Sequence, residues 1–251
     1  MDLGIEGRRA AVAAGSAGLG FASAQALAEA GVRVAVCGRD AGRVEEAAAR
    51  LPGAAIPLVA DVGSAEGATG FVAAAREALG GIDILVPNAG GPPPGNFAST
   101  PTEAYPDALA LNLLSVVAMC KEAVPAMQAQ GFGRVVAITS IAVRQPIPFL
   151  ILSNTARAGA TGFLKTLARE VARDGVTVNS VLPGVHDTGR VRALYGDDAE
   201  RAAAMAREVP VGRLGDPADF GRVVAFLCSE SAGFITGAAI PVDGGADTHL
   251  L

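Results

Sequence analysis

The sequence predicts an α/β fold in which a doubly wound parallel sheet of seven strands carries helices on both faces. Short apolar runs alternate with helical patterns along the whole chain, which is typical of a parallel sheet. Hydrophobic residues make up 51% of the chain and aromatic residues only 4%. Such a composition suits strands buried on both sides by Ala, Val, Leu and Ile. The strands are predicted in the run that begins at residue 9 and at residues 32–37, 55–60, 82–86, 133–140, 176–181 and 238–242.

The chain has 251 residues, a length that fits one α/β domain over residues 1–251. Its formal net charge is −5 and it has no basic cluster, so nucleic acid is not expected as a partner. No apolar run reaches the roughly 18 residues of a membrane span, so no membrane segment is expected. We read Arg8-Arg9 as the start of the first strand rather than as a twin-arginine signal.

The three cysteines are scattered and form no Cys-x-x-Cys pair, and the chain has two histidines. A metal site is therefore not expected. Buried free thiols in a reducing cytoplasm are the favoured interpretation of Cys37, Cys120 and Cys228.

A glycine-rich turn joins the first predicted strand to the first predicted helix, residues 21–30. A strand, a glycine turn, a helix and a second strand form the first unit of a dinucleotide-binding fold. Gly15 and Gly18 allow a tight turn and close approach to a phosphate, and Gly20 lets the helix pack near the strand. Free N–H groups at the helix start would bind the pyrophosphate. A plain glycine-rich loop is the alternative. The predicted binding residues are Gly15, Ser16, Ala17, Gly18, Leu19 and Gly20.

Arg39 follows the second strand, where the adenosine ribose of a bound dinucleotide lies. An acidic residue there would bind the 2′-hydroxyl of NAD, whereas an arginine pairs with the 2′-phosphate of NADP. Arg39 therefore favours NADP over NAD, and the hydroxyl of Ser16 can add a donor. The alternative makes Arg39 a solvated residue beside Asp40 as a helix N-cap. Asp61, at the end of the third strand, can accept from the adenine amino group or cap a turn.

The remaining helical patterns include one unusually long segment, residues 102–130, with Asn112 among leucines at its middle. A buried Asn needs hydrogen-bond partners, and inside a helix it often marks a distortion or a water site. The other helices are predicted at residues 43–51, 64–79, 153–173, 190–207 and 217–228.

Taken together in order, these residues resemble the short-chain dehydrogenase/reductase family over essentially the whole chain. Each motif is weak alone, but the series is very specific. It comprises the turn at 15–20, Asp61-Val62, Asn88-Ala89-Gly90, Asn112, Ser140, Pro183-Gly184 with Thr188, Gly212-Arg213, and residues 237–245.

The resemblance implies a Rossmann fold with seven parallel strands, an NAD(P) cofactor and a homotetramer or homodimer. It places Asn88, Ala89 and Gly90 beside the adenosine ribose. It places Pro183, Gly184 and Thr188 along the nicotinamide and its amide. The helices around 103–130 and 153–173 and the C-terminal segment would form the subunit contacts.

The chain departs from the family at two catalytic positions. The family active site consists of an Asn, a Ser, and a Tyr four residues before a Lys. Asn112 and Ser140 are present, but Ser153 stands where the family has Tyr and Arg157 where it has Lys. Ala13-Ala14 also replaces the family's Thr-Gly at the start of the glycine turn.

These departures remove the usual proton donor but keep a positive charge. A serine is a far weaker acid than a tyrosine, whose pKa is about 10, and arginine cannot relay a proton. A missing general acid costs roughly 10²–10⁴ in rate. Either another acid replaces it, with His186 favoured over Tyr105 and Tyr195, or the substrate needs no strong acid, as with an iminium, enone or quinone. A solvent-exposed loop histidine is the alternative for His186.

A third interpretation has no redox turnover: the chain would be an isomerase, lyase or cyclase, or a weakly active NADP-binding scaffold. We expect an NADP-dependent cytoplasmic oxidoreductase that reduces a carbonyl group, such as a ketone or 3-oxoacyl group, or a related C=N or C=C group. Ser140 and Asn112 would orient substrate and water, Arg157 would hold the nicotinamide ribose, and Ser153 would be a weak hydrogen-bond donor.

The segments expected to line the substrate pocket are residues 91–95, 142–152 and 186–208. The middle segment is mostly apolar, with Arg144 and Gln145 available for an anionic or carbonyl group. Packing within an oligomer is the alternative for these two residues.

Overall fold

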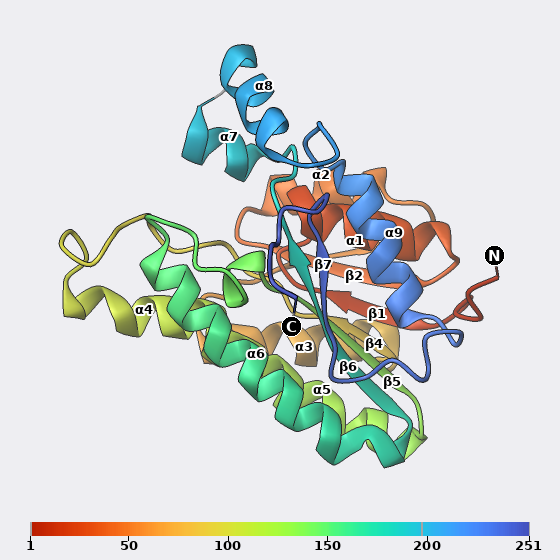
Figure 1. Cartoon of the computed structure of the whole chain (residues 1–251). Helices are drawn as coiled ribbons and strands as arrows, with labels where there is room; N and C mark the ends of the chain where they lie inside the picture. Colours follow the sequence, from red (N-terminus) through yellow and green to blue (C-terminus); the bar gives the residue numbers. More distant parts are fainter. Residues whose placement is uncertain (1, 197, 251) are drawn as a thin grey trace.

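Seven parallel strands form a single sheet in the order β3-β2-β1-β4-β5-β6-β7, as the computed structural model shows (Figure 1). The structure describes residues 2–196 and 198–250. The predicted doubly wound fold is confirmed, because every neighbouring pair of strands is parallel. The strands are β1 (Arg9–Val12), β2 (Arg33–Gly38), β3 (Ile56–Val59), β4 (Ile84–Val86), β5 (Gly133–Ile138), β6 (Val176–Pro183) and β7 (Ala239–Val242).

Alternate residues of each strand point to opposite faces of the sheet. Ala11 and Leu85 belong to a core covered by α3 (Ala65–Leu79), α5 (Ser115–Gln130) and α6 (Ile151–Val171). Val12 and Ile84 belong to a second core covered by α1 (Gly18–Glu29), α2 (Ala41–Arg50) and α9 (Pro217–Cys228). The strand side chains of both cores are mostly small, so the helices lie close against the sheet.

The segment predicted as one long helix is divided. It consists of a 3₁₀ turn (Thr102–Ala104), α4 (Tyr105–Leu109), a π-helical turn (Ala110–Leu114) and α5. Asn112 lies inside the π turn and is buried, so the predicted distortion at this residue is confirmed. π turns are rare and occur frequently at functional sites.

By length and composition alone, residues 102–130 could cross a membrane. In the structure, however, the α5 part packs beside α3 and contributes Val116, Met119, Cys120 and Met127 to the core. Its apolar character is therefore accounted for by packing on the sheet.

The segment predicted as a helix over residues 190–207 is also two elements, α7 (Gly189–Tyr195) and α8 (Ala199–Glu208). Gly196 ends α7 with a φ of 95°, a conformation that glycine adopts freely. The two helices form an arm that stands away from the sheet (Figure 1).

The glycine turn is tightly packed between β1 and α1. Gly20 must lack a side chain, because a Cβ atom there would lie 2.4 Å from the carbonyl oxygen of Ala14. Ala14 itself adopts a φ of +46°, which lies in the left-handed region that favours glycine. The chain therefore keeps the turn's shape while lacking the glycine that suits it.

At the N-terminal ends of the strands, an ion pair joins Arg9 of β1 to Asp83, the residue before β4. Asp83 is buried and accepts from Nε and Nη2 of Arg9 at 2.7 and 2.9 Å, and from the backbone N–H of Arg9 at 2.9 Å. Arg8 adds a longer contact of 3.9 Å. Burial alone would raise the pKa of Asp83, but the hydrogen bonds from Arg9 and the nearby positive charges hold it below its usual value.

All three cysteines are buried and free, as expected. Burial raises the pKa of each thiol to about 12, so all three are protonated at neutral pH.

Candidate active site

A cavity of about 410 Å³ lies where the strands end, between the glycine turn, the start of α6 and α7. Ligands of open α/β sheets bind at this edge. The cavity brings together most of the predicted site residues: Ala17, Gly18, Leu19, Gly20, Asn88, Ala89, Gly90, Ser140, Ser153, Arg157, Pro183, Gly184, His186 and Thr188. The predicted residues outside its lining are Gly15, Ser16, Arg39, Asp61, Val62 and Asn112.

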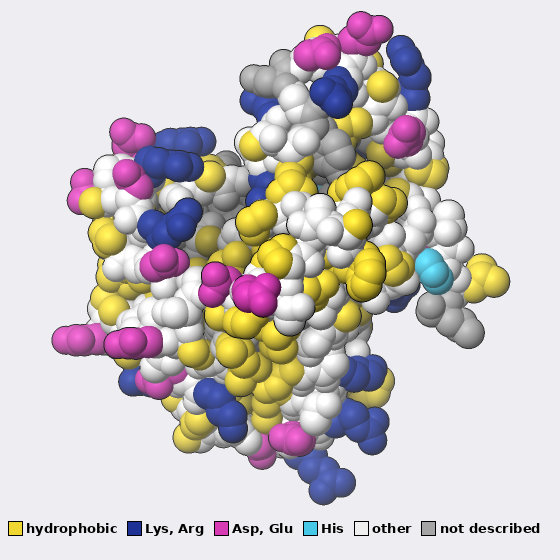
Figure 2. Space-filling model, turned by 90° about the vertical axis from the view of Figure 1, so that its left-hand side faces the viewer, with side chains coloured by type: hydrophobic (Ala, Val, Ile, Leu, Met, Phe, Trp, Pro, Cys, Tyr) yellow, Lys and Arg dark blue, Asp and Glu magenta, His cyan; other side chains and the backbone are white. Residues whose placement is uncertain are grey.

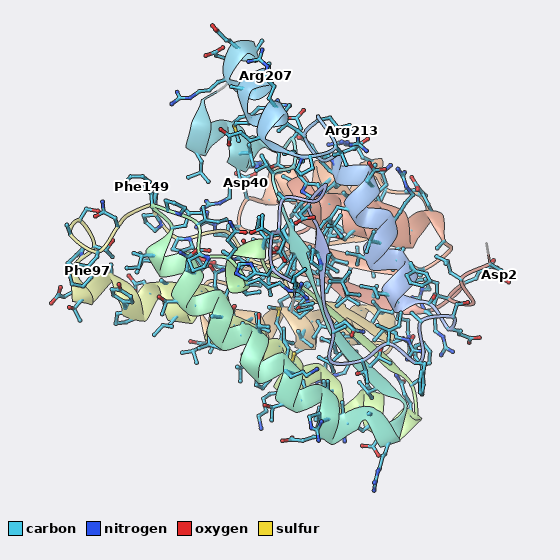
Figure 3. The ribbon with its side chains drawn as sticks, in the orientation of Figure 1. Asp2, Asp40, Phe97, Phe149, Arg207 and Arg213 are labelled. Atoms are coloured by element: carbon cyan, nitrogen blue, oxygen red, sulfur yellow. The ribbon has the colours of Figure 1, made fainter. Side chains whose placement is uncertain are left out.

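The side of the molecule beside the arm is shown as a surface in Figure 2. Apolar side chains gather across the middle of this face, and charged side chains surround them (Figure 2). Phe97 and Phe149 project from two loops on the α4 side (Figure 3) and are 88% and 65% exposed. The neighbouring residues Gly95 and Leu150 form a β-bridge, which holds these two loops together.

The start of α1 is suited to an anion. Its N-cap is Ala17, which offers no side-chain cap, and its first turn contains no acidic residue. The first N–H groups of the helix therefore lack side-chain partners and point toward the cavity bordered by Gly18 and Leu19. Thr188 stands opposite, with its side chain 3.8 Å from where a Cβ atom of Gly18 would lie.

Two arginines follow β2, on the side where the sequence predicts the adenosine of a dinucleotide. Arg39 is exposed directly after β2, while Arg43 borders the cavity. Asp40 is the N-cap of α2, because its side chain accepts from the backbone N–H of Arg43 at 2.8 Å. Asp40 therefore has the capping role that the sequence offered it. The sequence analysis missed Arg43, although it stands only four residues after Arg39 in the sequence.

Three predicted binding residues make contacts near the turn. Asn88 donates from Nδ2 to the carbonyl oxygen of Ala14 over a long 3.4 Å, which links the end of β4 to the glycine turn. Ser16 lies beside Gly38, where a Cβ atom would come within 2.9 Å of its hydroxyl oxygen. Asp61 accepts from the backbone N–H of Gly63 at 2.9 Å, so in this structure it caps a turn.

Ser153 and Arg157, at the positions where the resemblance leads one to expect Tyr and Lys, are in direct contact. Nε of Arg157 donates to Oγ of Ser153 at 3.2 Å, and Nη1 donates to the carbonyl oxygens of Ile138 and Thr139 at 3.1 and 3.2 Å. Ser153 is only 7% exposed and lines the cavity. Because Oγ accepts from arginine, the hydroxyl proton of Ser153 is left to donate elsewhere.

Arg157 has no carboxylate partner among the described residues. Burial, with a smaller contribution from the charge of Arg190, lowers its pKa to about 10. The guanidinium nevertheless stays positively charged at neutral pH, and its Nη2 group makes no hydrogen bond within the described chain. This side chain therefore places an uncompensated positive charge beside Ser153.

Ser140 has a similar arrangement at the end of β5. Its Oγ accepts from the backbone N–H of Ala142 at 3.1 Å, which caps a 3₁₀ turn (Ile141–Val143). Its hydroxyl proton is thus also available. Ser140 and Ser153 thus both present a hydroxyl donor in the lining of the same cavity.

Asn112 lies outside the cavity lining and supports the loop after β4. Its Nδ2 donates to the carbonyl oxygen of Gly90 at 2.8 Å, while its buried Oδ1 has no partner among the described residues. Asn112 therefore fixes the loop after β4 and leaves one acceptor for a water molecule.

His186 borders the cavity, but its ring is 3% exposed and packed elsewhere. The ring meets Phe220 edge to face with centroids 5.3 Å apart, and Gly215 lies against it. Nδ1 contacts the carbonyl oxygen of Gly184 at 3.2 Å, and burial lowers the pKa of the ring. The solvent-exposed alternative for His186 is therefore wrong. The contacts favour a packing role over proton donation.

Arg144 and Gln145 do not line the cavity and contact other parts of the chain. Arg144 pairs with Asp247 at 3.4 Å and donates to the carbonyl oxygen of Ala239 at 2.9 Å, and Gln145 contacts Thr248. The expectation that these residues hold an anionic substrate group is thus wrong, because the C-terminal segment folds back onto them. Arg190 is the arginine that lines the cavity from the arm, and the sequence analysis did not single it out.

Comparison with known proteins decides the family. A family model described as enoyl-(acyl carrier protein) reductase matches residues 13–247. The human protein dehydrogenase/reductase SDR family member 4 is 38% identical over 245 residues, covering 96% of this chain and 88% of its own. The chain belongs to the short-chain dehydrogenase/reductase family.

Two solved structures of this family are similar throughout. L-sorbose reductase from Gluconobacter frateurii, complexed with NADPH and L-sorbose, is 31% identical with a TM-score of 0.93, and the match covers 100% of both chains. An NADPH-bound short chain oxidoreductase from Pseudomonas aeruginosa PAO1, described as containing an atypical catalytic center, is 35% identical with a TM-score of 0.89. That match covers 96% of this chain and 97% of the other.

Proposed function

We propose that this short-chain dehydrogenase/reductase is an NADPH-dependent reductase of a carbonyl group or a related C=N or C=C group. Ser153, polarised by Arg157, would be the hydrogen-bond donor to the reacting oxygen. The observation that carries this proposal is the contact from Nε of Arg157 to Oγ of Ser153 inside the cavity. The NADPH complexes of the similar reductases support the choice of cofactor.

The residues present fit a phosphorylated dinucleotide. The uncapped start of α1 would bind the pyrophosphate together with Thr188. Arg39 and Arg43 would bind the 2′-phosphate, since Asp40 beside them is used as a cap. Asn88, Ala89 and Gly90 would line the adenosine ribose, and Pro183 and Gly184 the nicotinamide. Ser16, Asp61 and Val62 do not line the cavity, and in this proposal they would lie near the adenosine. When bound, NADPH would supply the hydride.

Around the reacting oxygen, the chain supplies charge and donors. Ser140 and Ser153 would each donate to the substrate oxygen, and Arg157 would stabilise the negative charge that develops on it. Arg157 holds its proton at neutral pH, so it acts by charge and not by proton transfer. Nη2 of Arg157, which makes no hydrogen bond within the described chain, would also bind the nicotinamide ribose.

The proton comes from solvent in this proposal. Ser153 would donate its proton and regain one from water positioned by Asn112, whose Oδ1 is left without a partner among the described residues. His186 is the second candidate for this step, but its ring is packed against Phe220. We expect a slow enzyme, because replacing a tyrosine acid costs about 10²–10⁴ in rate.

The deciding experiment uses NADPH deuterated at the transferable position of the nicotinamide. The purified chain is incubated with a mixed library of ketones, oxo acids and their esters, imines and enones. Products are screened by mass spectrometry for a one-unit shift that is absent without enzyme. A labelled product identifies the substrate class. The Ser153→Ala variant should form it far more slowly, whereas Thr155→Ala, two residues along the same helix, should not.

The absence of label with every library member, while NADPH binding is seen by calorimetry, would count against the reductase proposal. That result would favour the alternative functions, an isomerase, a lyase, a cyclase or a binding scaffold. Incubating the same library with unlabelled NADP⁺ separates these possibilities, because a non-redox enzyme converts a substrate without changing the absorbance of the nicotinamide.

We also propose a cytoplasmic homotetramer or homodimer. Large apolar side chains left exposed in the single chain support association, among them Phe97, Phe149 and Phe234. Light scattering coupled to size exclusion tests the proposal, since a monomer at micromolar concentration would contradict it.

A further inference from the structure

Among the described residues that line the cavity, three are arginines and none is Asp or Glu. Arg43 lies on the adenosine side. The other two, Arg157 and Arg190, lie close enough for the charge of Arg190 to act on Arg157. The described lining of the cavity is therefore positively charged, and Arg157 has no carboxylate partner within it.

The cofactor places no phosphate beside Arg157 in the arrangement proposed above. Its pyrophosphate belongs at the start of α1, and its 2′-phosphate belongs at Arg39 and Arg43. A buried guanidinium without an anion is costly, so a bound ligand that supplies one gains affinity. The anion that would balance the charge of Arg157 is therefore expected to come from the substrate.

Arg190 is placed to meet a substrate. It comes from the first turn of α7 and lines the cavity, and its Nη2 donates to the carbonyl oxygen of Pro92 at 3.1 Å. Gly91 allows this approach, because a Cβ atom there would lie 2.1 Å from Nη2 of Arg190. The guanidinium of Arg190 thus connects α7 to the loop after β4.

Large apolar side chains also line the cavity. They include Ile141, Ile147, Leu150, Val191 and Leu194. A cavity lined by apolar side chains together with two positive charges fits a molecule with an apolar body and one anionic end.

We propose that the substrate is an oxo acid with a free carboxylate, and that Arg190, together with the charge of Arg157, binds that carboxylate. This inference rests on the proposed reductase function. The reaction would convert an oxo acid to a hydroxy acid: the carbonyl carbon gains the hydride that NADPH supplies, the oxygen gains a proton, and NADP⁺ is released. The carboxylate is unchanged and serves only to orient the carbonyl group toward Ser140 and Ser153.

The test compares acids with their neutral esters. Initial rates with NADPH are measured for 4-methyl-2-oxopentanoate and 3-oxohexanoate and for the methyl ester of each. The preferred acid should exceed its ester in kcat/KM by about 10- to 100-fold, the range expected for hydrogen bonds to a charged group. Arg190→Gln should remove most of that preference by slowing the acid and not the ester. Arg190→Lys, which keeps the charge, should retain part of it.

Arg192→Gln is the matched control, because Arg192 lies on the same helix, outside the cavity lining, and contacts Asp187 at 2.9 Å. It should leave the preference for acids unchanged. Esters reduced as well as acids would overturn the inference while leaving the reductase proposal intact. It would also be overturned if Arg190→Gln raised the KM for NADPH without changing the acid-to-ester ratio, since Arg190 would then serve the cofactor.

A binding measurement separates the two proposals if no substrate is turned over. Calorimetry on the NADP⁺-loaded protein uses oxamate and malonamate, which mimic 2-oxo and 3-oxo acids, with the neutral diamides oxamide and malonamide as controls. Binding of one carboxylate but not of its diamide, lost in Arg190→Gln, would support the inference even where the reductase proposal fails. Binding of neither carboxylate would overturn it.

Discussion

Arg157 donates from Nε to Oγ of Ser153 over 3.2 Å, one helical turn apart on α6. The bond orients the serine hydroxyl and leaves its proton free for a substrate. Replacing Ser153 with Ala removes that donor, so kcat should fall by about 10²-fold. The KM for NADPH should stay the same, because the guanidinium remains. Steady-state kinetics with the substrate found by deuterium labelling measures both.

Thr155→Ala is the control for this change, since the Thr155 hydroxyl is exposed and bonded to its own helix at the carbonyl oxygen of Ile151. A Ser153→Ala variant that kept full activity would remove Ser153 from the mechanism.

Restoring the family's pair tests the same site in the opposite direction. In the double variant Ser153→Tyr with Arg157→Lys, the phenol would extend into the cavity that Ser153 already borders. Reduction of simple ketones should rise, by up to the roughly 10²–10⁴ that a general acid contributes. Each single variant is measured as well, because the tyrosine needs a neighbouring cation. No gain in the double variant, with NADPH still bound, would favour a non-redox function.

Cofactor choice should depend on the arginines that follow β2. Arg39→Asp or Arg43→Gln should each weaken NADPH by about 10- to 100-fold relative to NADH, because each removes a charged contact to the 2′-phosphate. The ratio of kcat/KM values for the two cofactors measures the effect. Arg173→Gln makes the same change of charge as Arg43→Gln, but at an exposed position after α6, and should leave the ratio unchanged. If the two cofactors were weakened equally, the assignment would be wrong.

Ala14 should be improved by glycine. Its φ of +46° is strained for alanine, so Ala14→Gly should raise the free energy of unfolding by about 1 kcal/mol. Ala13 does not share that conformation, so Ala13→Gly should lower the free energy of unfolding by about 0.5–1 kcal/mol. Urea denaturation of the two variants measures both values. The same sign for both changes would contradict this account of the turn.

Stability should decrease in acid because of Asp83. Its pKa is lowered in the folded protein, so its contribution to stability is fully present above its unfolded value near 3.9 and is lost as the pH falls through the folded value. Asp83→Asn should cost about 3 kcal/mol at pH 7, because Arg9 loses its buried partner. The variant's stability should also change less than that of the native chain below pH 4.

Urea unfolding from pH 7 to pH 3 gives both quantities. Asp219→Asn, in an exposed ion pair with Arg213 and Arg222, should leave the free energy of unfolding nearly unchanged at pH 7. Parallel pH profiles for Asp83→Asn and the native chain would contradict the assignment.

The elements that follow local rules could be predicted from the sequence. Buried parallel strands appear as apolar runs, and Ser64 caps α3 at the predicted position. The distortion at Asn112 was predictable because a polar residue stood among leucines. The division of residues 190–207 was not recognised, although Gly196 lies at the break.

Contacts between distant segments could not be predicted. Asp247 of the C-terminal segment pairs with Arg144, about a hundred residues earlier in the chain. His186 is held by Phe220 and Gly215, which also belong to a later part of the chain. The contact between Ser153 and Arg157 was accessible in principle, since residues four apart on a helix are neighbours. What the sequence could not show is that Arg157 has no carboxylate partner among the described residues, so that its positive charge acts on Ser153.

The π turn at Ala110–Leu114 makes the site sensitive to a change in chain length at one place. A π turn contains one residue more than the α-turn it interrupts, and each residue of a helix rotates the chain by about 100°. Deleting one residue here would let α4 and α5 merge into one regular helix. The residues before the deletion, including α4, would then rotate by about 100° relative to α5, which is anchored in the core. Asn112 would leave the carbonyl group of Gly90, and the loop after β4 would lose its support. A one-residue deletion in the π turn should therefore disrupt the site.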